Sequence, residues 1–212
     1  MAPRIALIHA LRHSPPPIEA AFAQLWPQAR LMNLLDDSLS TDLQRAGALD
    51  DAMTGRFLRL GRYAARSGAN AILFTCSAFA PCIDAVKADL PELPVLKPYE
   101  AMIEEAAEHG SRIALIASFA QALTSMPPEF PPTLRVTPLF APGALAALDL
   151  GDGAAHDRLV AEAASGLKGQ DAVALAQFSL ARAAAAVAAV SGLPVLTTPH
   201  SAVRKLKRIF RS

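Results

Sequence analysis

The sequence has few cysteines, little net charge and no long apolar run. Two cysteines occur in 212 residues, and the formal net charge is +1. Because so small a charge gives no general attraction to nucleic acid or acidic membranes, we expect a small-molecule ligand and neither of those partners. No segment approaches the roughly 18 consecutive apolar residues of a membrane helix. The apolar run before His9 is too short for a signal-peptide core, so we expect a cytoplasmic protein.

The cysteines and histidines form no recognisable metal or disulfide pattern. Cytoplasmic thiols stay reduced, so a disulfide between Cys76 and Cys82 is not expected. His9, His13 and His200 lie far from both cysteines in sequence, which matches no zinc spacing. The sequence also lacks a glycine-rich phosphate loop and a dinucleotide fingerprint. We therefore expect neither a metal nor a cofactor.

Short apolar runs alternate with longer helical patterns along the whole chain. The predicted strands are 4–9, 29–35, 71–76, 94–96, 112–117, 134–140, 172–177 and 194–198. The predicted helices are 51–67, 77–88, 99–109, 154–168, 179–191 and 199–210, with another that opens at residues 15–17. Continuous apolar strands followed by helices predict an α/β protein with mainly parallel sheets covered on both faces.

The chain also repeats itself in a fixed order. The matched blocks are RIALI at 4–8 and 112–116, NAILFTCSAF at 70–79 with DAVALAQFSL at 171–180, and LPVL at 93–96 and 193–196. A repeat of this length predicts two homologous α/β lobes rather than a solenoid of many short units. We place the first lobe at residues 1–97 plus 197–212 and the second at 98–196.

The repeat also predicts where a ligand binds. Ligands of open α/β sheets lie beyond the carboxyl ends of the strands, and two lobes related by a pseudo-two-fold axis can set those ends facing each other. We therefore expect an active-site cleft between the lobes. The candidate residues lie at or after the ends of predicted strands: His13, Ser14, Cys76, Ser77, Ser118, Phe119, Gln177, Ser179, Thr197, Thr198 and His200.

The two cysteines have different expected roles. Cys76 lies at a strand-to-helix turn, where backbone N–H groups and the helix dipole are expected to lower the pKa of a thiol. Cys82 lies farther along the following helix and at a different helical angle, so we expect it in the core. The repeat puts Gln177 at the position of Cys76 in the second lobe, and glutamine cannot exchange a proton at neutral pH.

The segments ILFTCSAFA, VALAQFSLA and LPVLTTPHSAV, together with the duplicated pattern, resemble the aspartate/glutamate/hydantoin racemase superfamily. That superfamily includes cofactor-independent amino acid racemases, maleate isomerase and arylmalonate decarboxylase. The resemblance implies two cysteines facing each other across the lobe interface. One thiolate removes the proton from the carbon next to a carboxylate, and the other thiol protonates the opposite face. Cys76 matches the first-lobe cysteine, whereas Gln177 stands in place of the second.

The resemblance also implies residues that bind a carboxylate-bearing substrate. Ser14 matches a polar residue that meets the substrate carboxylate, and Ser118 with Phe119 follows a strand after which family members bind a carboxylate. Ser77 offers its amide and hydroxyl beside the cysteine. Each of these serines is equally suited to a helix N-cap, so the structural alternative stays open. The resemblance further suggests a homodimer, since dimers are common among such proteins.

Racemisation without a second thiol needs another acid. His200 and His13 are the available candidates, although an isolated histidine is more often a surface or capping residue. Thr198, beside His200, lies at a strand end that is polar in both lobes, and we include it among the substrate-binding residues.

Three functions stay open. The first is a cofactor-independent Asp/Glu racemase-like isomerase with Cys76 as acid/base. The second is an arylmalonate decarboxylase-like enzyme, in which a single cysteine protonates the product from one face. The third is a non-catalytic relative that binds small carboxylates.

Overall fold

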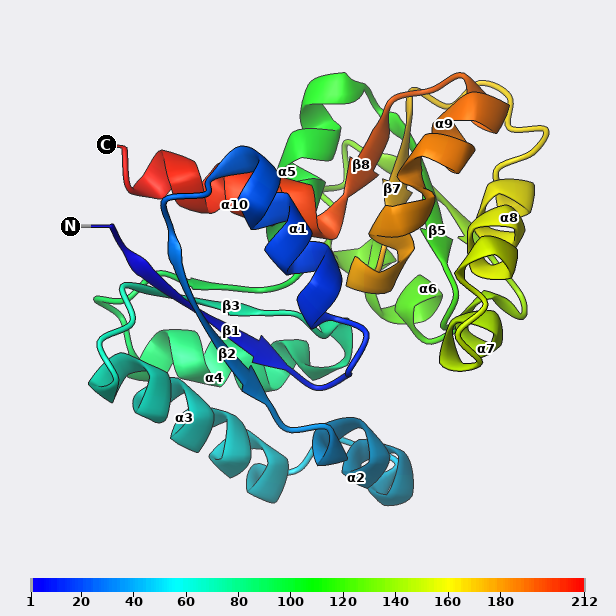
Figure 1. The fold of residues 1–212 in the computed structure, drawn as a ribbon. Helices are drawn as coiled ribbons and strands as arrows, with labels where there is room; N and C mark the ends of the chain where they lie inside the picture. Colours follow the sequence, from blue (N-terminus) through cyan, green and yellow to red (C-terminus); the bar gives the residue numbers. More distant parts are fainter. Residues whose placement is uncertain (1, 212) are drawn as a thin grey trace. The chain divides into compact units, whose positions relative to one another are not determined.

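The computed structural model describes residues 2–211 and divides the chain into two compact units (Figure 1). The first unit comprises Met1–Pro98 with Ala202–Ser212, and the second comprises Tyr99–Ser201. Each unit contains one four-stranded parallel sheet flanked by helices. The prediction of an α/β fold with two parallel sheets is therefore confirmed.

The first unit is built around the strand order β2-β1-β3-β4. Its elements are β1 (Arg4–His9), α1 (Pro15–Leu25), β2 (Arg30–Leu35), α2 (Ser38–Ala46), α3 (Asp51–Arg66), β3 (Ala71–Phe74), the 3-10 turn η1 (Ser77–Phe79), α4 (Ala80–Asp89) and β4 (Val95–Leu96). Helices α3 and α4 cover one face of this sheet, and α1 covers the other (Figure 1). Most of the last helix, α10 (Thr198–Ile209), also belongs to this unit.

The second unit has the same strand order, β6-β5-β7-β8. Its elements are α5 (Glu100–His109), β5 (Arg112–Ala117), α6 (Ala122–Ser125), the 3-10 turn η2 (Pro127–Glu129), β6 (Arg135–Phe140), α7 (Ala144–Asp149), α8 (Gly153–Ala163), β7 (Ala172–Leu175), the 3-10 segment η3 (Phe178–Ala183), α9 (Ala184–Ser191) and β8 (Val195–Thr197). The register of the central strands repeats as well, because Ile8 pairs with Phe74 and Ile116 pairs with Leu175.

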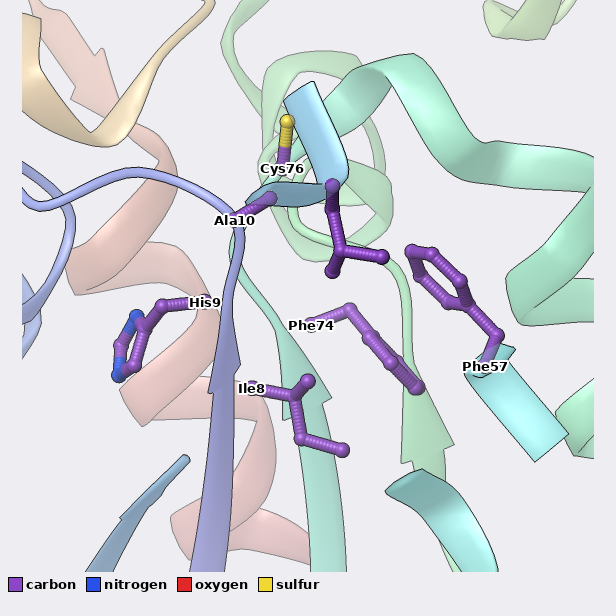
Figure 2. Close-up of a pocket in the computed structure, with 7 residues that line it drawn as sticks. Ile8, His9, Ala10, Phe57, Phe74 and Cys76 are labelled. Atoms are coloured by element: carbon purple, nitrogen blue, oxygen red, sulfur yellow. The ribbon is translucent and has the colours of Figure 1, made fainter. Parts of the chain in front are cut away.

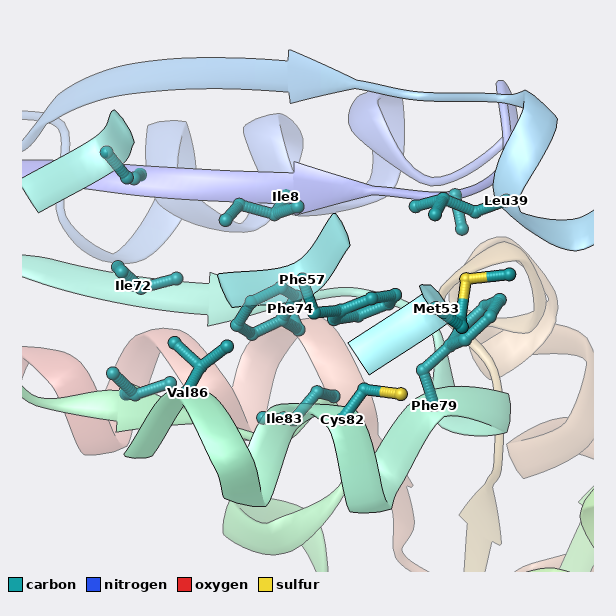
Figure 3. Packing of buried hydrophobic residues seen from close by; sticks show 14 of the residues in the cluster. Ile8, Leu39, Met53, Phe57, Ile72, Phe74, Phe79, Cys82, Ile83 and Val86 are labelled. Atoms are coloured by element: carbon teal, nitrogen blue, oxygen red, sulfur yellow. The ribbon is translucent and has the colours of Figure 1, made fainter. Parts of the chain in front are cut away.

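The core of the first unit is aromatic. Phe57 from α3 stacks on Phe74 from β3 at 5.3 Å between ring centroids, and lies 4.9 Å from the ring of Phe79. Cys82 lies in the same cluster and is fully buried, as predicted (Figure 3). Its Sγ is 3.5 Å from the Thr54 hydroxyl.

The C-terminal helix places its apolar stripe inward. Val203 and Leu206 are fully buried. The Lys207 amine donates a hydrogen bond to the Leu25 carbonyl at the end of α1, and the Phe210 ring lies 5.8 Å from Trp26. The basic side chains of α10 thus surround a docked face. None of the helices between residues 2 and 211 combines the length and apolar character needed to cross a bilayer.

Differences from the predicted elements are confined to short segments. The predicted strands at 71–76 and 172–177 end at Phe74 and Leu175, because the chain turns into 3-10 segments right after them. Helices α2, α6 and α7 were not predicted. These three helices have nine residues or fewer, too short for a clear apolar period.

Candidate active site

Cys76 follows β3 and has an extended backbone, with φ −121° and ψ 123°, just before the 3-10 turn η1. It is a free thiol and its side chain is partly buried. The Ala78 backbone N–H and the Ser40 hydroxyl, near the start of α2, interact with the sulfur, and both act to lower the pKa of the thiol. Cys76 also lines a narrow crevice with Phe57, Phe74 and Leu39 (Figure 2). The thiol therefore lies at the border between polar donors and the aromatic core.

The predicted lowering of the Cys76 pKa is wrong in direction. Burial raises the pKa of this thiol, and the hydrogen bonds from Ala78 and Ser40 offset only part of the rise. The reason is local geometry, since only a 3-10 turn of three residues follows Cys76 and α4 begins at Ala80. A single short turn brings little helix dipole, while the apolar crevice disfavours the thiolate.

Ser40 was missed in the sequence because nothing distinguishes it from the other polar residues of the stretch DDSLS at 36–40. The single proton of its hydroxyl is shared, because the hydroxyl also donates to the carbonyl of Ala10, just after β1, at 3.1 Å. The helix that carries Ser40 is fixed by Arg56 from α3, which forms ion pairs with Asp36 and Asp42 at 2.6 Å each. Burial acts to raise the pKa of Asp36, but hydrogen bonds from Ser38 and Arg56 outweigh it and lower that pKa.

A polar chain, exposed at its outer end and buried at its inner end, also reaches the residue before Cys76. The His9 ring is fully buried, with Nδ1 2.9 Å from the Thr75 hydroxyl and Nε2 3.0 Å from Asn33 Oδ1. The Asn33 amide in turn donates to the Glu19 carboxylate at 2.6 Å. Burial lowers the pKa of His9, partly offset by Asn33 and Glu19. The sequence showed His9 and Thr75 only as unremarkable strand residues.

Ser14 and Ser77 are the two predicted carboxylate-binding serines of the first unit. Ser14 is buried at the N-cap position of α1, but among residues 2–211 its side chain makes no capping hydrogen bond. Ser77 is the first residue of η1, and Cys76 occupies the N-cap position instead. The capping alternative therefore does not account for either hydroxyl.

In the second unit, Gln177 lies at the end of β7, at the position that matches Cys76. Its Oε1 accepts hydrogen bonds from the Ser118 N–H at 2.8 Å and from the Ser118 hydroxyl at 3.3 Å. This pairing assigns the Gln177 carbonyl oxygen and turns its amide NH₂, a pure donor, the other way. Ser118 is buried, and it does not cap the next helix, because Gln121 occupies the N-cap position of α6.

The other predicted residues of this unit lie around the ends of β5 and β8. Phe119 is 45% exposed. His200 Nδ1 lies 2.7 Å from the Thr197 hydroxyl, and this hydroxyl also accepts the His200 N–H at 3.4 Å. The Thr197 hydroxyl thus orients the His200 ring through Nδ1. Thr198 is fully buried, and its hydroxyl has no partner among the described residues.

Comparison with solved structures gives one consistent fold. The chain superposes on allantoin racemase from Klebsiella pneumoniae with a TM-score of 0.76 at 18% identity, covering 99% of this chain and 88% of that one. Glutamate racemase from Thermus thermophilus superposes with a TM-score of 0.73 at 20% identity, covering 99% of this chain and 80% of that one. Unliganded arylmalonate decarboxylase superposes with a TM-score of 0.64 at 17% identity, covering 98% of this chain and 92% of that one. At these identities the likeness shows the fold alone.

Sequence comparison defines the family. No curated protein matches the chain significantly. The model of the family described as Asp/Glu/Hydantoin racemase matches residues 13–123, just over half of the chain, and this segment includes Cys76 with its flanking strand and turn. By this match, the chain belongs to the Asp/Glu/hydantoin racemase family.

Proposed function

We propose that this chain is an isomerase that transfers a proton at the carbon alpha to a carboxylate, without a cofactor and with Cys76 as the acid/base. Membership of the racemase family supports an enzyme of this type. The observation that carries the proposal is the environment of Cys76: a partly buried free thiol at the carboxyl end of β3, beside the Ala78 and Ser40 donors. Ligands of open α/β sheets bind at such strand ends.

The raised pKa gives Cys76 a preferred direction of proton transfer. Because burial raises this pKa, the thiol is protonated at neutral pH and ready to donate to a carbanion or enediolate. Ser40 and Ala78 then stabilise the thiolate that remains. In the reverse direction the same two donors make the thiolate accessible as a base.

Gln177 takes a different role from a second thiol. Its oxygen is occupied by Ser118, so its NH₂ group is the part suited to donate to a substrate carboxylate. Racemisation needs a second acid, and we assign that role to His200, whose ring is oriented by the hydrogen bond between Nδ1 and the Thr197 hydroxyl.

A second candidate is an arylmalonate decarboxylase-like activity. A single protonated thiol suits a reaction that breaks the bond from the alpha carbon to a carboxylate and protonates the resulting enediolate from one face. The raised pKa of Cys76 and the replacement of the second thiol by Gln177 favour this alternative.

One experiment separates these functions. The protein is incubated with amino acids, hydantoins, allantoin and arylmalonates in D₂O, while NMR follows the alpha proton and any released carbon dioxide. Exchange of the alpha proton without loss of substrate supports the isomerase, and carbon dioxide release supports the decarboxylase. If neither reaction occurs and Cys76→Ala binds these carboxylates as the wild type does, the chain is a binding protein and both enzymatic proposals fail.

A further inference from the structure

The polar chain behind Cys76 is present in only one of the two matched sheets. In the first unit His9 ends β1 and Thr75 follows β3, and their side chains pair at 2.9 Å. In the second unit the matching positions are Ala117 and Ala176. The backbone is the same in both, since the Thr75 N–H donates to Ile8 and the Ala176 N–H donates to Ile116. The fold therefore does not need a polar pair at this point.

The hydrogen bonds of this chain specify the state of the His9 ring. The Asn33 NH₂ donates to the Glu19 carboxylate, so Asn33 turns its oxygen toward His9 Nε2. That nitrogen must then carry a hydrogen, and Nδ1 of the neutral ring becomes an acceptor. The Thr75 hydroxyl consequently donates to Nδ1, although the Ile8 carbonyl lies 3.3 Å away as an alternative acceptor. Burial lowers the pKa of His9 and so favours the neutral ring.

The polar chain ends at Thr75, one residue before the thiol. It lies on the face of the sheet opposite the crevice that Cys76 lines. Figure 2 shows the His9 ring on the other side of β1 from Ile8, Phe57 and Phe74. Thr75 is thus bonded through its side chain on the face where His9 lies, while Cys76 contacts the crevice. The inner pair of this chain, His9 and Thr75, is buried, and a buried polar pair whose hydrogen bonds are satisfied specifies one arrangement of the backbone.

We propose that His9 is a positioning residue for Cys76: through Thr75, the chain Glu19–Asn33–His9–Thr75 sets the strand end that presents the thiol. The kinetic part of this proposal rests on the proposed function, but the position of the thiol does not. Without the hydroxyl of Thr75, the strand end loosens, water reaches the sulfur, and the geometry for proton transfer is lost.

The test compares Thr75→Val, which keeps the shape and removes the hydroxyl, with Thr75→Ser, which keeps the hydroxyl. Iodoacetamide labelling is followed by mass spectrometry at both cysteines, and buried Cys82 reports any general opening of the unit. In Thr75→Val we expect Cys76 to be labelled about fivefold faster, because hydration increases the thiolate fraction. Cys82 stays protected, and Thr75→Ser behaves as the wild type. Thr54→Val, which removes a hydroxyl beside Cys82 in the same unit, leaves Cys76 labelling unchanged.

Steady-state kinetics adds an independent readout where turnover is found. Thr75→Val and His9→Phe should lower kcat about tenfold with KM nearly unchanged, as expected for a misplaced acid/base. Absence of turnover in the wild type would count against the proposed function alone, since the labelling assay needs no substrate.

Nitrogen-15 NMR of the wild-type protein tests the chain without any substitution. We expect the neutral His9 ring with its proton on Nε2. A proton on Nδ1 of a neutral His9, or equal Cys76 labelling in Thr75→Val and Thr75→Ser, would overturn the proposal.

Discussion

The two units have the same sheet and different strand ends. Both have the central strand RIALI, the same strand order and the same register. After the third strand of each sheet, the first unit presents Cys76 and the second presents Gln177. The thiol is backed by a buried imidazole, while the amide is paired with Ser118. The same backbone arrangement thus presents a thiol in one unit and an amide in the other.

The opposite ends of the two sheets are matched more closely. Asn70 accepts a hydrogen bond from the Arg4 N–H at 2.8 Å, and Asp171 accepts one from the Arg112 N–H at 2.9 Å. Gly110 lies so close to Asp171 that a Cβ would meet its side chain at 2.5 Å, and its φ of 144° also favours glycine. The hydrogen bonds at the amino ends of the central strands are therefore alike in the two units, whereas the side chains at the carboxyl ends of the strands differ.

The cores differ in composition as well. The first unit packs Phe57, Phe74 and Phe79 together, whereas the corresponding cluster of the second unit is aliphatic and rich in alanine. Three aromatic rings next to Cys76 explain why its surroundings are so apolar. The stability of the first unit should therefore be more sensitive to truncation of a single side chain.

The largest effect should come from the thiol itself. We expect Cys76→Ser to lower the rate of alpha-proton exchange or decarboxylation about 10²- to 10⁴-fold, because a hydroxyl is a much weaker acid than a thiol. Cys82→Ala, a substitution in the core of the same unit, is the matched control and should retain most of the activity. The rates are measured by NMR in D₂O. A Cys76→Ser variant within a few fold of the wild type would remove Cys76 from the mechanism.

Truncation of the two cores should have unequal effects. Phe57→Ala is expected to reduce the free energy of unfolding by about 3–5 kcal/mol, because it removes a buried ring and leaves a cavity. Val187→Ala in the second unit should cost about 1.5 kcal/mol for its two lost methyl-sized groups. Urea denaturation followed by circular dichroism measures both. Equal losses would show that the aromatic cluster is not specially important.

Removal of the Gln177 amide should affect binding more than turnover. We expect Gln177→Leu to raise KM for a carboxylate substrate about tenfold with little change in kcat, since the lost hydrogen bond serves the bound carboxylate. Gln170→Leu is the control, because that amide bonds to Thr137 elsewhere in the same unit. A fall in kcat with an unchanged KM would instead assign Gln177 to the chemical step.

The smallest effect concerns the turn at Asp171, where the matching turn of the first unit has the uncharged Asn70. Hydrogen bonds from Arg112 lower the pKa of Asp171 to about 2, below its ordinary value of 3.8. The carboxylate therefore stabilises the fold above about pH 4, and this contribution is lost as the pH falls toward 2. Asp171→Asn should flatten the stability profile in that range, since Asn70 serves the matching turn without a charge. The measurement is urea denaturation between pH 2 and pH 5, and an unchanged profile would contradict the assignment.

Much of the fold could be predicted, because its signals lie within short stretches of chain. The strands at 4–9 and 112–117 were predicted with their observed bounds, since continuous apolar runs and a verbatim repeat mark them. Cys82 was placed in the core from its helical angle. Ser40 and His9 could not be recognised, because their roles depend on contacts with distant residues.

The amino-acid pattern alone predicts the duplicated α/β arrangement, the cysteine at the end of the third strand and the glutamine at its matching position. Periodicity and repetition are local properties, so they can be found without coordinates. Only the tertiary structure decided the ionisation of Cys76 and the partner of Gln177. Phe57 and Leu39 reach the crevice from other elements, and burial of the thiol reverses the pKa shift that the local turn suggests, although Ser40 offsets part of the rise.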